Sequence, residues 1–442
     1  MRRNLNQSMN MIRDIRSSSV VWLLCGILLG CDAYGLGIRQ PEQGAAATAQ
    51  NDAFTAQADN PSAIYYNPAG LLQITGTETL VGATVYGPEA TYKGKGDGAG
   101  ASKGTQDDIF VLPHFYAVSD FGIQWFRAGL GVYTPFGQSV DWGNNNSFRY
   151  VTTRSELEMV NINPTIAVRV TSNLFFGVGY DFYYCDADVR RAFPFVVFAP
   201  GPVFLGEGNV RFTGHGEGHG FNVGGMWKLH EQHTVGAAYR SGVDVEFEGH
   251  AKISDTPPLP GFPKKIKEHA RAEFNFPDIV QIGYAFWPTP RWKIEVDGDW
   301  THWDVTNKQA LKSQGLKALG VPKSLLTTKL NWEDSWIVML GTQYEVKNGV
   351  FLRGGWYFSE NSVPEKNFIP TVADNDRVGV SAGLGFKRKN WSLDVAYQFN
   401  ITLDRSVKNN VGSDPFPPIS QSVDGDYESY SQGGAISVGF HF

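Results

Sequence analysis

Two short stretches carry residue types that could do chemistry, and the first is the run GASKG at residues 100–104. It matches the Gly-x-Ser-x-Gly pattern of serine hydrolases. That chemistry needs the serine on a sharp turn between a strand and a helix, whereas Ser102 stands in a Gly- and Lys-rich connection between two expected strands. We therefore predict no catalytic residue here and no enzyme activity for the chain.

The second stretch is GHGEGHG, residues 214–220, in which His215, Glu217 and His219 alternate with glycine. On a strand these three side chains would share one face, and imidazole and carboxylate groups can bind a transition metal. The same residues also suit a solvated strand face that binds no ion. We favour the solvated face and predict neither a metal nor another cofactor.

Such side chains share a face only if they stand on strands, and the sequence beyond residue 75 has the period of strands. In WSLDVAYQFNITLD, residues 391–404, apolar and aromatic residues alternate strictly with polar ones or alanine. About fourteen segments show this pattern. Their expected extents are 76–93, 107–119, 123–140, 155–172, 174–191, 209–229, 232–251, 267–287, 290–307, 326–347, 349–360, 376–388, 390–408 and 426–442.

The length and polarity of these strands indicate a membrane barrel and not a soluble sandwich. Sandwich turns recur every ~8–12 residues, whereas these strands are much longer. Charged and amide side chains share one face, as a polar lumen requires, and Trp, Tyr, Phe, Leu and Val share the other. Closure into an even-stranded antiparallel barrel satisfies the backbone groups in lipid. Most of Trp287, Trp292, Trp300, Trp303, Trp332 and Trp336 are expected in a girdle at the lipid head groups.

The N-terminus has the features of an export signal. Arg residues precede an apolar run from Val20 to Leu29 that is too short to span a bilayer, and Ala33-Tyr34-Gly35 fits a cleavage site. We predict a signal peptide at residues 1–35. Leu28-Leu29-Gly30-Cys31 also resembles a lipoprotein cleavage box, so lipidation of Cys31 stays open. The net charge of −6 without basic clusters predicts no nucleic-acid partner.

One long connection, FPFVVFAPGPVFLG at residues 193–206, is apolar and aromatic. An exposed apolar surface of this kind usually marks a binding site. We predict that Phe193, Phe195, Phe198 and Phe204 capture a hydrophobic ligand, with the Pro-rich run at 255–263 as their neighbour. The alternative is that they only pack within the loop.

The segment GAAATAQNDAFTAQADNPSAIYYNPAGL, residues 44–71, does not alternate like the strands that follow it. Together with them it resembles the long-chain fatty acid transporter family of Gram-negative outer membranes, which includes channels for aromatic hydrocarbons. The motifs that carry the resemblance are Asn67-Pro68-Ala69, TPFG at 134–137, NFP at 275–277, NWEDSW at 331–336 and the last strand ending in Phe442.

The resemblance implies an all-β fold: a 14-stranded antiparallel transmembrane barrel, residues 76–442, plugged by a small, mostly helical hatch, residues 36–75. It implies that cargo passes from the loops to a lumen site near the mature N-terminus at Leu36. From there cargo leaves sideways at a kink in the third strand. Asn67, Pro68 and Ala69 of the hatch would lie beside that kink, which is formed by Pro135, Phe136 and Gly137. We expect Asn67 to offer hydrogen-bond partners to the backbone groups that the interrupted strand leaves unpaired.

The resemblance also assigns a head-group site, and here the chain departs from it. Arg191 matches a family arginine that meets the fatty acid carboxylate, but Glu333 stands where its partner lysine is expected. A second carboxylate would repel an anionic head group or pair with Arg191, which favours a neutral cargo. Lys329, four residues earlier, would be able to compensate.

From these features we predict a passive bacterial outer-membrane channel for hydrophobic small molecules, either fatty acids or hydrocarbons. Its expected partners are its cargo, outer-membrane lipid and the barrel-assembly machinery, which would recognise the C-terminal Phe442. The alternative is a surface barrel that transports nothing, such as an adhesin, for which a hatch and a kinked wall would have no use. The sequence leaves the cargo and the oligomeric state open.

Overall fold

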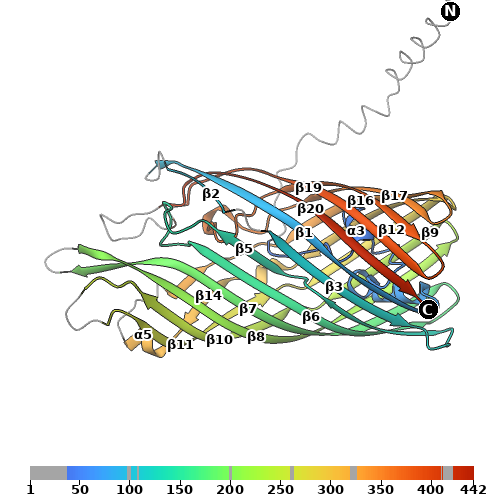
Figure 1. Cartoon of the computed structure of the whole chain (residues 1–442), viewed down its shortest axis with the longest axis horizontal. Coiled ribbons are helices and arrows are strands. Elements are labelled where there is room, and N and C mark those ends of the chain that lie inside the picture. The colour runs from blue at the N-terminus through green and yellow to red at the C-terminus, as the bar shows by residue number, and fades with distance from the viewer. Residues whose placement is uncertain are drawn as a thin grey trace, which may run out of the picture. The chain divides into compact units, whose positions relative to one another are not determined.

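Figure 1 shows the computed structural model of the chain, which describes residues 37–96, 101–106, 109–198, 202–258, 263–318, 326–409, 411 and 422–442. At 196–198 and 202 it describes the backbone only. The predicted signal peptide, Cys31 and Leu36 lie outside the described residues, as does the side chain of Phe198.

The described residues form one antiparallel β-sheet with a few short helices. The strands are β1 Thr77–Gly94, β2 Ser102–Gly104, β3 Phe110–Ser119, β4 Phe126–Tyr133, β5 Gly137–Asp141, β6 Arg154–Arg169, β7 Leu174–Phe198, β8 Pro202–His230, β9 His233–Arg240, β10 Val243–Ser254, β11 Ile266–Phe276, β12 Ile279–Thr289, β13 Trp292–Thr301, β14 Lys308–Lys312, β15 Thr327–Lys329, β16 Ser335–Lys347, β17 Val350–Ser359, β18 Arg377–Lys387, β19 Trp391–Val407 and β20 Gly425–His441. The helices are α3 Ala45–Thr48, α4 Ala63–Tyr66, η2 Pro68–Gln73, η4 Trp303–Val305, α5 Gln314–Ala318 and η6 Glu365–Asn367. None of the described helices is long and apolar enough to cross a membrane.

The sheet closes on itself into a barrel, because β1 pairs with β20 on one side and with β3 on the other. Six of its wall strands are interrupted by a short break, so that each consists of two segments in line: β2 and β3, β4 and β5, β9 and β10, β11 and β12, β13 and β14, β15 and β16. Counted with these pairs joined, the wall has fourteen antiparallel strands. The predicted barrel of fourteen strands is confirmed.

The alternation that predicted the strands also fixes which way their side chains face. On β19, Val395, Tyr397 and Ile401 are exposed on the outer surface, and Gln398 and Asn400 between them are buried in the lumen. β1, β3 and β16 show the same alternation of exposure. The outer surface of this part of the barrel is therefore apolar, as contact with lipid requires.

The polarity reverses towards the end of the barrel where β2, β14 and α5 lie in Figure 1, here called the loop end. On β10, Val243, Val245 and Phe247 are buried inside, while Asp244, Glu246 and Glu248 are exposed outside. The prediction that the lumen is polar is therefore wrong for this part of the barrel. Charged side chains are costly in hydrocarbon, so these strand ends extend beyond it.

The two stretches considered first for chemistry lie on strands. Ser102 is on β2, which pairs with β1, so it does not stand on a turn into a helix. His215, Glu217 and His219 are exposed on the outer face of β8, and His219 stacks on Tyr180. The three side chains therefore share one exposed face of the strand, as the alternation with glycine predicted.

Residues 37–75, here called the N-terminal segment, are mostly buried and contact lumen-facing residues of the wall. The Ala45 N–H donates to Ser437 Oγ (3.0 Å) and the Asn51 N–H to Ser381 Oγ (3.0 Å). Local sequence starts its helix η2: the side chain of Asn67 accepts from the Ala69 N–H, and Pro68 occupies the first helical position.

Glycines in the wall make room for this segment. A Cβ at Gly236 would stand 2.3 Å from the Thr55 carbonyl oxygen, whereas one at Gly298 would meet nothing within 4 Å. We expect Gly236→Val to loosen the segment by ~1–3 kcal/mol, as overpacking does. Chymotrypsin should then cut after Phe54 or Tyr65 faster than in Gly298→Val, in barrels that keep their heat-modifiable gel mobility. Equal cleavage rates in the two variants would contradict this packing.

Candidate transport path

The third wall strand is broken at Thr134-Pro135-Phe136, between β4 and β5. Proline has no N–H for a ladder, which explains why the strand stops at this point. β4 pairs with β3 and β6, whereas β5 pairs with β6 alone among the described residues. The predicted kink is therefore a real interruption of the wall.

The N-terminal segment supplies hydrogen-bond partners to this break. The Gln40 N–H donates to the Pro135 carbonyl (2.9 Å), and the Gly137 N–H donates to the Ile38 carbonyl (3.0 Å). The side chains of Gln40 and Gln43 donate to the carbonyls of Gly137 (2.9 Å) and Thr134 (2.8 Å). Left buried without partners, each such group would cost ~1–3 kcal/mol.

Asn67 has a different role from the one expected, which was to bind the broken strand. Its side-chain amide donates to the carbonyls of Thr55 (2.8 Å) and Gly225 (3.1 Å). Pro68 lies against the backbone of β7 and β8, where a Cβ at Gly177 would be 2.4 Å from its carbonyl carbon. Asn67 and Pro68 therefore fix the segment to the wall beside β7 and β8, and Ile38 to Gln43 contact the break.

A cavity of about 680 Å³ lies where the wall is interrupted. Residues Phe110–Pro113 of β3 line one side and Gly137–Asp141 of β5 the other. No strand pairing of the described residues joins these two stretches, because β3 pairs with β4 only from Phe115 to Ser119. The cavity reaches buried Arg39 and Glu42 inside and exposed Val111 and Val160 outside. We call it the wall cavity.

A second, apolar pocket of about 50 Å³ adjoins the wall cavity. Its apolar lining consists of Ile38, Leu157, Ala187, Val189, Phe212, Phe247, Ala272, Phe274, Leu330, Trp332, Ile369 and Val372. Five residues line both spaces: Gln138, Glu156, Leu157, Thr371 and Val372. The apolar pocket and the wall cavity therefore form adjoining parts of one region of the lumen.

The two spaces differ in charge. The described lining of the apolar pocket includes no Lys, Arg or His, and its carboxylates Glu156 and Glu273 are ion-paired with Arg154 and Lys312. The wall cavity holds Arg39, Glu42, Asp374 and Arg377. Burial raises the pKa of the Glu42 carboxyl, which Arg377 and Arg39 nearby offset only in part. An ionised ligand would find counter-charges in the wall cavity and none in the apolar pocket.

Over residues 33–442 the chain matches the family described as Outer membrane protein transport protein (OMPP1/FadL/TodX). The chain belongs to this family. It is therefore an outer-membrane β-barrel of a family of transporters for hydrophobic substrates.

Individual members of the FadL/TodX family are distant from this chain. It is 24% identical to the long-chain fatty acid transport protein of Escherichia coli O6:H1 over 369 residues, 77% of this chain and 81% of the relative. Its fold is similar to that of a Pseudomonas aeruginosa FadL homologue, with a TM-score of 0.80 at 18% identity over 92% of this chain and 100% of the other. The toluene transporter TbuX of Ralstonia pickettii has a similar fold, with a TM-score of 0.66 at 15% identity over 90% of this chain and 98% of the other.

Of the head-group residues that the FadL/TodX resemblance assigns, Glu333 is exposed, and its backbone N–H donates to the Ser362 carbonyl (2.8 Å). Its neighbour Trp332 is the residue that enters the apolar pocket. Trp332 packs on Trp303 with ring centroids 4.9 Å apart, and both are buried in the lumen, not in the predicted girdle.

The predicted capture loop is the end of a long hairpin. β7 and β8 stay paired from Leu174 and Trp227 to Phe198 and Pro202, so Phe193 to Phe204 stand on strands. Phe195 is buried against Phe193 (5.2 Å between rings), while Phe204 is 41% exposed. A Cβ at Gly206 would be 3.2 Å from Pro257, so the Pro-rich run is a neighbour, as predicted. Of the predicted capture residues whose side chains are described, Phe204 is thus the most exposed.

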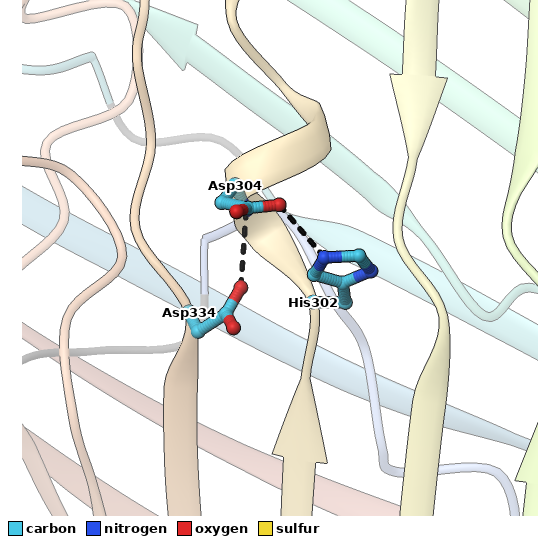
Figure 2. Close-up of side chains that lie close together, drawn as sticks. All are labelled: His302, Asp304 and Asp334. Atoms are coloured by element: carbon cyan, nitrogen blue, oxygen red, sulfur yellow. Dashed lines mark hydrogen bonds and ion pairs between the residues drawn. The ribbon is translucent and has the colours of Figure 1, made fainter.

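Figure 2 shows the described group most similar to a metal site, His302, Asp304 and Asp334. His302 Nε2 lies 2.7 Å from Asp304, and its Nδ1 lies 3.3 Å from Asp278. Asp304 and Asp334 are exposed. Both ring nitrogens already face carboxylates, so we interpret the group as an exposed ion-pair cluster.

Sequence reasoning missed the inward aromatics Phe212, Phe247 and Phe274, and the connection between β17 and β18, whose Ile369 and Val372 line the apolar pocket. The alternation placed these phenylalanines on one face of their strands. What it lacked was the reversal of polarity near the loop end. The runs DVEFE and HARAE, in which charged residues or histidine alternate with apolar residues, were the available signal.

Proposed function

We propose that this protein lets hydrophobic small molecules diffuse passively across the outer membrane and releases them sideways into lipid. The observation that carries the proposal is the wall cavity, which reaches from Arg39 and Glu42 in the lumen to exposed Val111 and Val160 on the outer face. Its volume of about 680 Å³ lies within the range of small-molecule sites, roughly 300–1,000 Å³. Among the described residues the wall has no ladder to bridge it.

In this proposal the N-terminal segment, with Leu36 before it, is the hatch of the barrel. Its residues are buried in the lumen, and Ile38 to Gln43 hold the broken third strand in its interrupted form. The loop end faces outside the cell. The barrel-assembly machinery recognises Phe442, which follows the last strand and is 81% exposed. Lipid surrounds the apolar outer face.

Cargo would follow the apolar surfaces in order. It meets Phe193, Phe195 and Phe204, together with Phe198, at the tip of the β7–β8 hairpin, moves into the apolar pocket and enters the wall cavity. Transfer of apolar groups from water is worth ~0.8 kcal/mol per CH₂. Lipid is therefore the favourable destination, and no coupled energy source is needed.

The hairpin step predicts a concentration-dependent defect. Phe204→Asp with Phe193→Asp removes two rings from the first contact surface. We expect uptake of a radiolabelled hydrocarbon to fall several-fold at low concentration and to recover at high concentration, because the later path is unchanged. Barrel assembly should be normal by heat-modifiable mobility. Unchanged uptake at low concentration would leave these rings as packing only.

For cargo, the charge of the apolar pocket favours an uncharged hydrocarbon over a fatty acid. A carboxylate there would be buried without a cation, which costs several kcal/mol. The pocket's 50 Å³ is also smaller than a cavity of ~150 Å³ that binds benzene, so its side chains must move even for a small ring.

The test of cargo charge is competition between toluene and a short fatty acid for binding to the purified protein, with Val372→Lys as the probe variant. Val372 lines both spaces and is half-buried, so a lysine there introduces one cation. We expect the unchanged protein to prefer toluene, and Val372→Lys to shift the preference towards the fatty acid by about tenfold, or ~1.4 kcal/mol. A fatty acid preference in the unchanged protein would overturn the neutral-cargo proposal.

A further inference from the structure

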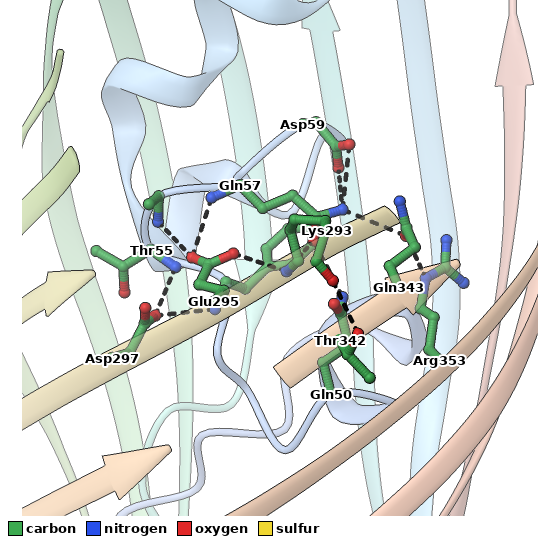
Figure 3. Close-up of polar contacts among 12 residues, drawn as sticks. Gln50, Thr55, Gln57, Asp59, Lys293, Glu295, Asp297, Thr342, Gln343 and Arg353 are labelled. Carbon is green, nitrogen blue, oxygen red and sulfur yellow. Dashed lines mark hydrogen bonds and ion pairs between the residues drawn. The ribbon is translucent and has the colours of Figure 1, made fainter. Parts of the chain in front are cut away.

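One strand of the wall presents a row of charged side chains to the N-terminal segment. Lys293, Glu295, Asp297 and Asp299 stand at every second position of β13, and each is at most 1% exposed. Figure 3 shows the first three of them meeting residues of the N-terminal segment. A charged group is rarely buried so completely without a dedicated partner.

Two of these carboxylates bind four consecutive backbone N–H groups. Asp297 Oδ2 accepts from the N–H of Phe54 (2.9 Å) and of Thr55 (2.8 Å). Glu295 Oε1 accepts from the N–H of Ala56 (2.7 Å) and of Gln57 (3.0 Å). The run 54–57 thus lies along β13 with every backbone donor satisfied by a charge-assisted bond, the stronger kind of hydrogen bond.

The neighbouring charges make this arrangement depend on the N-terminal segment. Lys293 Nζ donates to Glu295 Oε2 (2.7 Å) and to Gln57 Oε1 (2.6 Å), and Asp299 is ion-paired with Arg39 of the segment (2.5 Å). Among the described residues no ion pair includes Asp297, whose hydrogen bonds to the segment come from the two backbone N–H groups of Phe54 and Thr55. If residues 54–57 moved away from β13, the Asp297 carboxylate would remain buried and would lose these two hydrogen bonds.

Elsewhere the segment's backbone is held by single, scattered contacts. Ser437 and Ser381 accept from Ala45 and Asn51 through neutral hydroxyls. Arg240 and Arg127 donate to the carbonyls of Tyr65 (3.3 Å) and Ile74 (2.6 Å), and Asp374, in the connection before β18, accepts from the Gly37 N–H (2.8 Å). Among the described wall strands, β13 is the one whose carboxylates take backbone N–H groups of the segment. On β13, by contrast, two carboxylates bind four consecutive backbone N–H groups of the segment.

We propose that Glu295 and Asp297 are positioning residues for transport, which hold residues 54–57 across the lumen and keep it closed to water-soluble solutes while cargo leaves through the wall. This inference rests on the proposed function, in which the N-terminal segment is the hatch. Loss of the two charges frees the run 54–57 from β13 and opens a path along the lumen.

The test compares Glu295→Gln with Asp297→Asn, made together, against Asp394→Asn. All three substitutions keep size and remove charge. Asp394 is an equally lumen-facing buried carboxylate, ion-paired with Arg353 (2.6 Å), that makes no bond to residues 54–57. Asp297→Asn alone is the second variant. It leaves the Lys293–Glu295 pair intact, so the buried Lys293 keeps its ion-pair partner.

Two readouts report an open lumen in barrels that are folded by heat-modifiable mobility. One is ion conductance in planar bilayers. The other is the rate at which a membrane-impermeant maleimide labels Ala56→Cys in a Cys185→Ser background; Ala56 is 1% exposed. We expect the double variant to be labelled about tenfold faster and to conduct more, Asp297→Asn to show part of this effect, and Asp394→Asn to equal the unchanged protein.

Different results would contradict the role of the two carboxylates and the proposed hatch. If the carboxylate variants are labelled as slowly and conduct as little as Asp394→Asn, the role of Glu295 and Asp297 is overturned, and the proposed hatch is not affected. If the Ala56→Cys protein without further changes is already labelled rapidly and conducts freely, the closed lumen, and with it the proposed hatch, is overturned.

Discussion

Gly137→Arg is expected to lower uptake of a hydrophobic cargo at least about tenfold, an increase of ~1.4 kcal/mol or more in the barrier to exit. Gly137 lines the wall cavity, and a Cβ there meets only the Leu157 carbonyl oxygen, 3.3 Å away. The backbone therefore needs to shift little, and the guanidinium fills the space between β3 and β5. A fixed charge also makes that exit unfavourable for an apolar molecule.

Uptake of a radiolabelled hydrocarbon by cells measures this effect, with binding to the purified protein as a second readout. Gly137→Ala is the control, since it adds the Cβ without filling the cavity, and it should transport nearly normally. Binding at the hairpin and the apolar pocket should survive in both variants. A folded Gly137→Arg protein that transports as fast as Gly137→Ala would show that cargo does not use this exit.

Phe247→Asp should abolish binding of hydrophobic cargo in the apolar pocket, with uptake reduced at least about tenfold. Phe247 is 3% exposed, points into the lumen from β10 and lines the apolar pocket. A carboxylate at this site would be buried in a lining whose described residues offer no free cation, at a cost of several kcal/mol.

Phe247→Leu is the matched control, because it keeps the site apolar and changes only its shape. We expect it to lower affinity less than about fivefold, or ~1 kcal/mol. Heat-modifiable mobility separates a folding defect from a binding defect in both proteins. Equal affinities in Phe247→Asp and Phe247→Leu would remove the apolar pocket from the transport path.

The sequence was sufficient for the barrel because alternation is a direct record of which side of a strand meets lipid. Residues 391–404 separate completely into an outer and an inner face in the sequence, and β19 keeps that arrangement as far as Thr402, after which a shift in register exposes both Leu403 and Asp404. Alternation shows only which residues share a face of the strand. It does not show at which residue the strand leaves the lipid. The predicted polar lumen therefore went wrong on β10, where Phe247 faces in and Glu248 faces out.

The transport path was harder to predict because its parts depend on pairing across the barrel. Pro135 and Gly137 were local signals of a break, and the break is there. Which residues satisfy it depends on how the N-terminal segment folds back, and Gln43 takes the role expected of Asn67. Trp332 and Glu333 are adjacent in sequence, and only the register after the break before β16 decides which one faces the lumen.

Reversible linkage across the wall cavity tests the central claim, exit between β3 and β5, most directly. Leu112→Cys on β3 and Ser139→Cys on β5 both line the cavity, and a cleavable bis-maleimide would join them in a Cys185→Ser protein. The control pair, Leu384→Cys with Val395→Cys, joins register partners of a closed ladder. We expect linkage to stop hydrocarbon uptake only in the first pair, and cleavage of the linker to restore it. Normal uptake by a protein in which Leu112→Cys and Ser139→Cys are fully linked would contradict exit between β3 and β5.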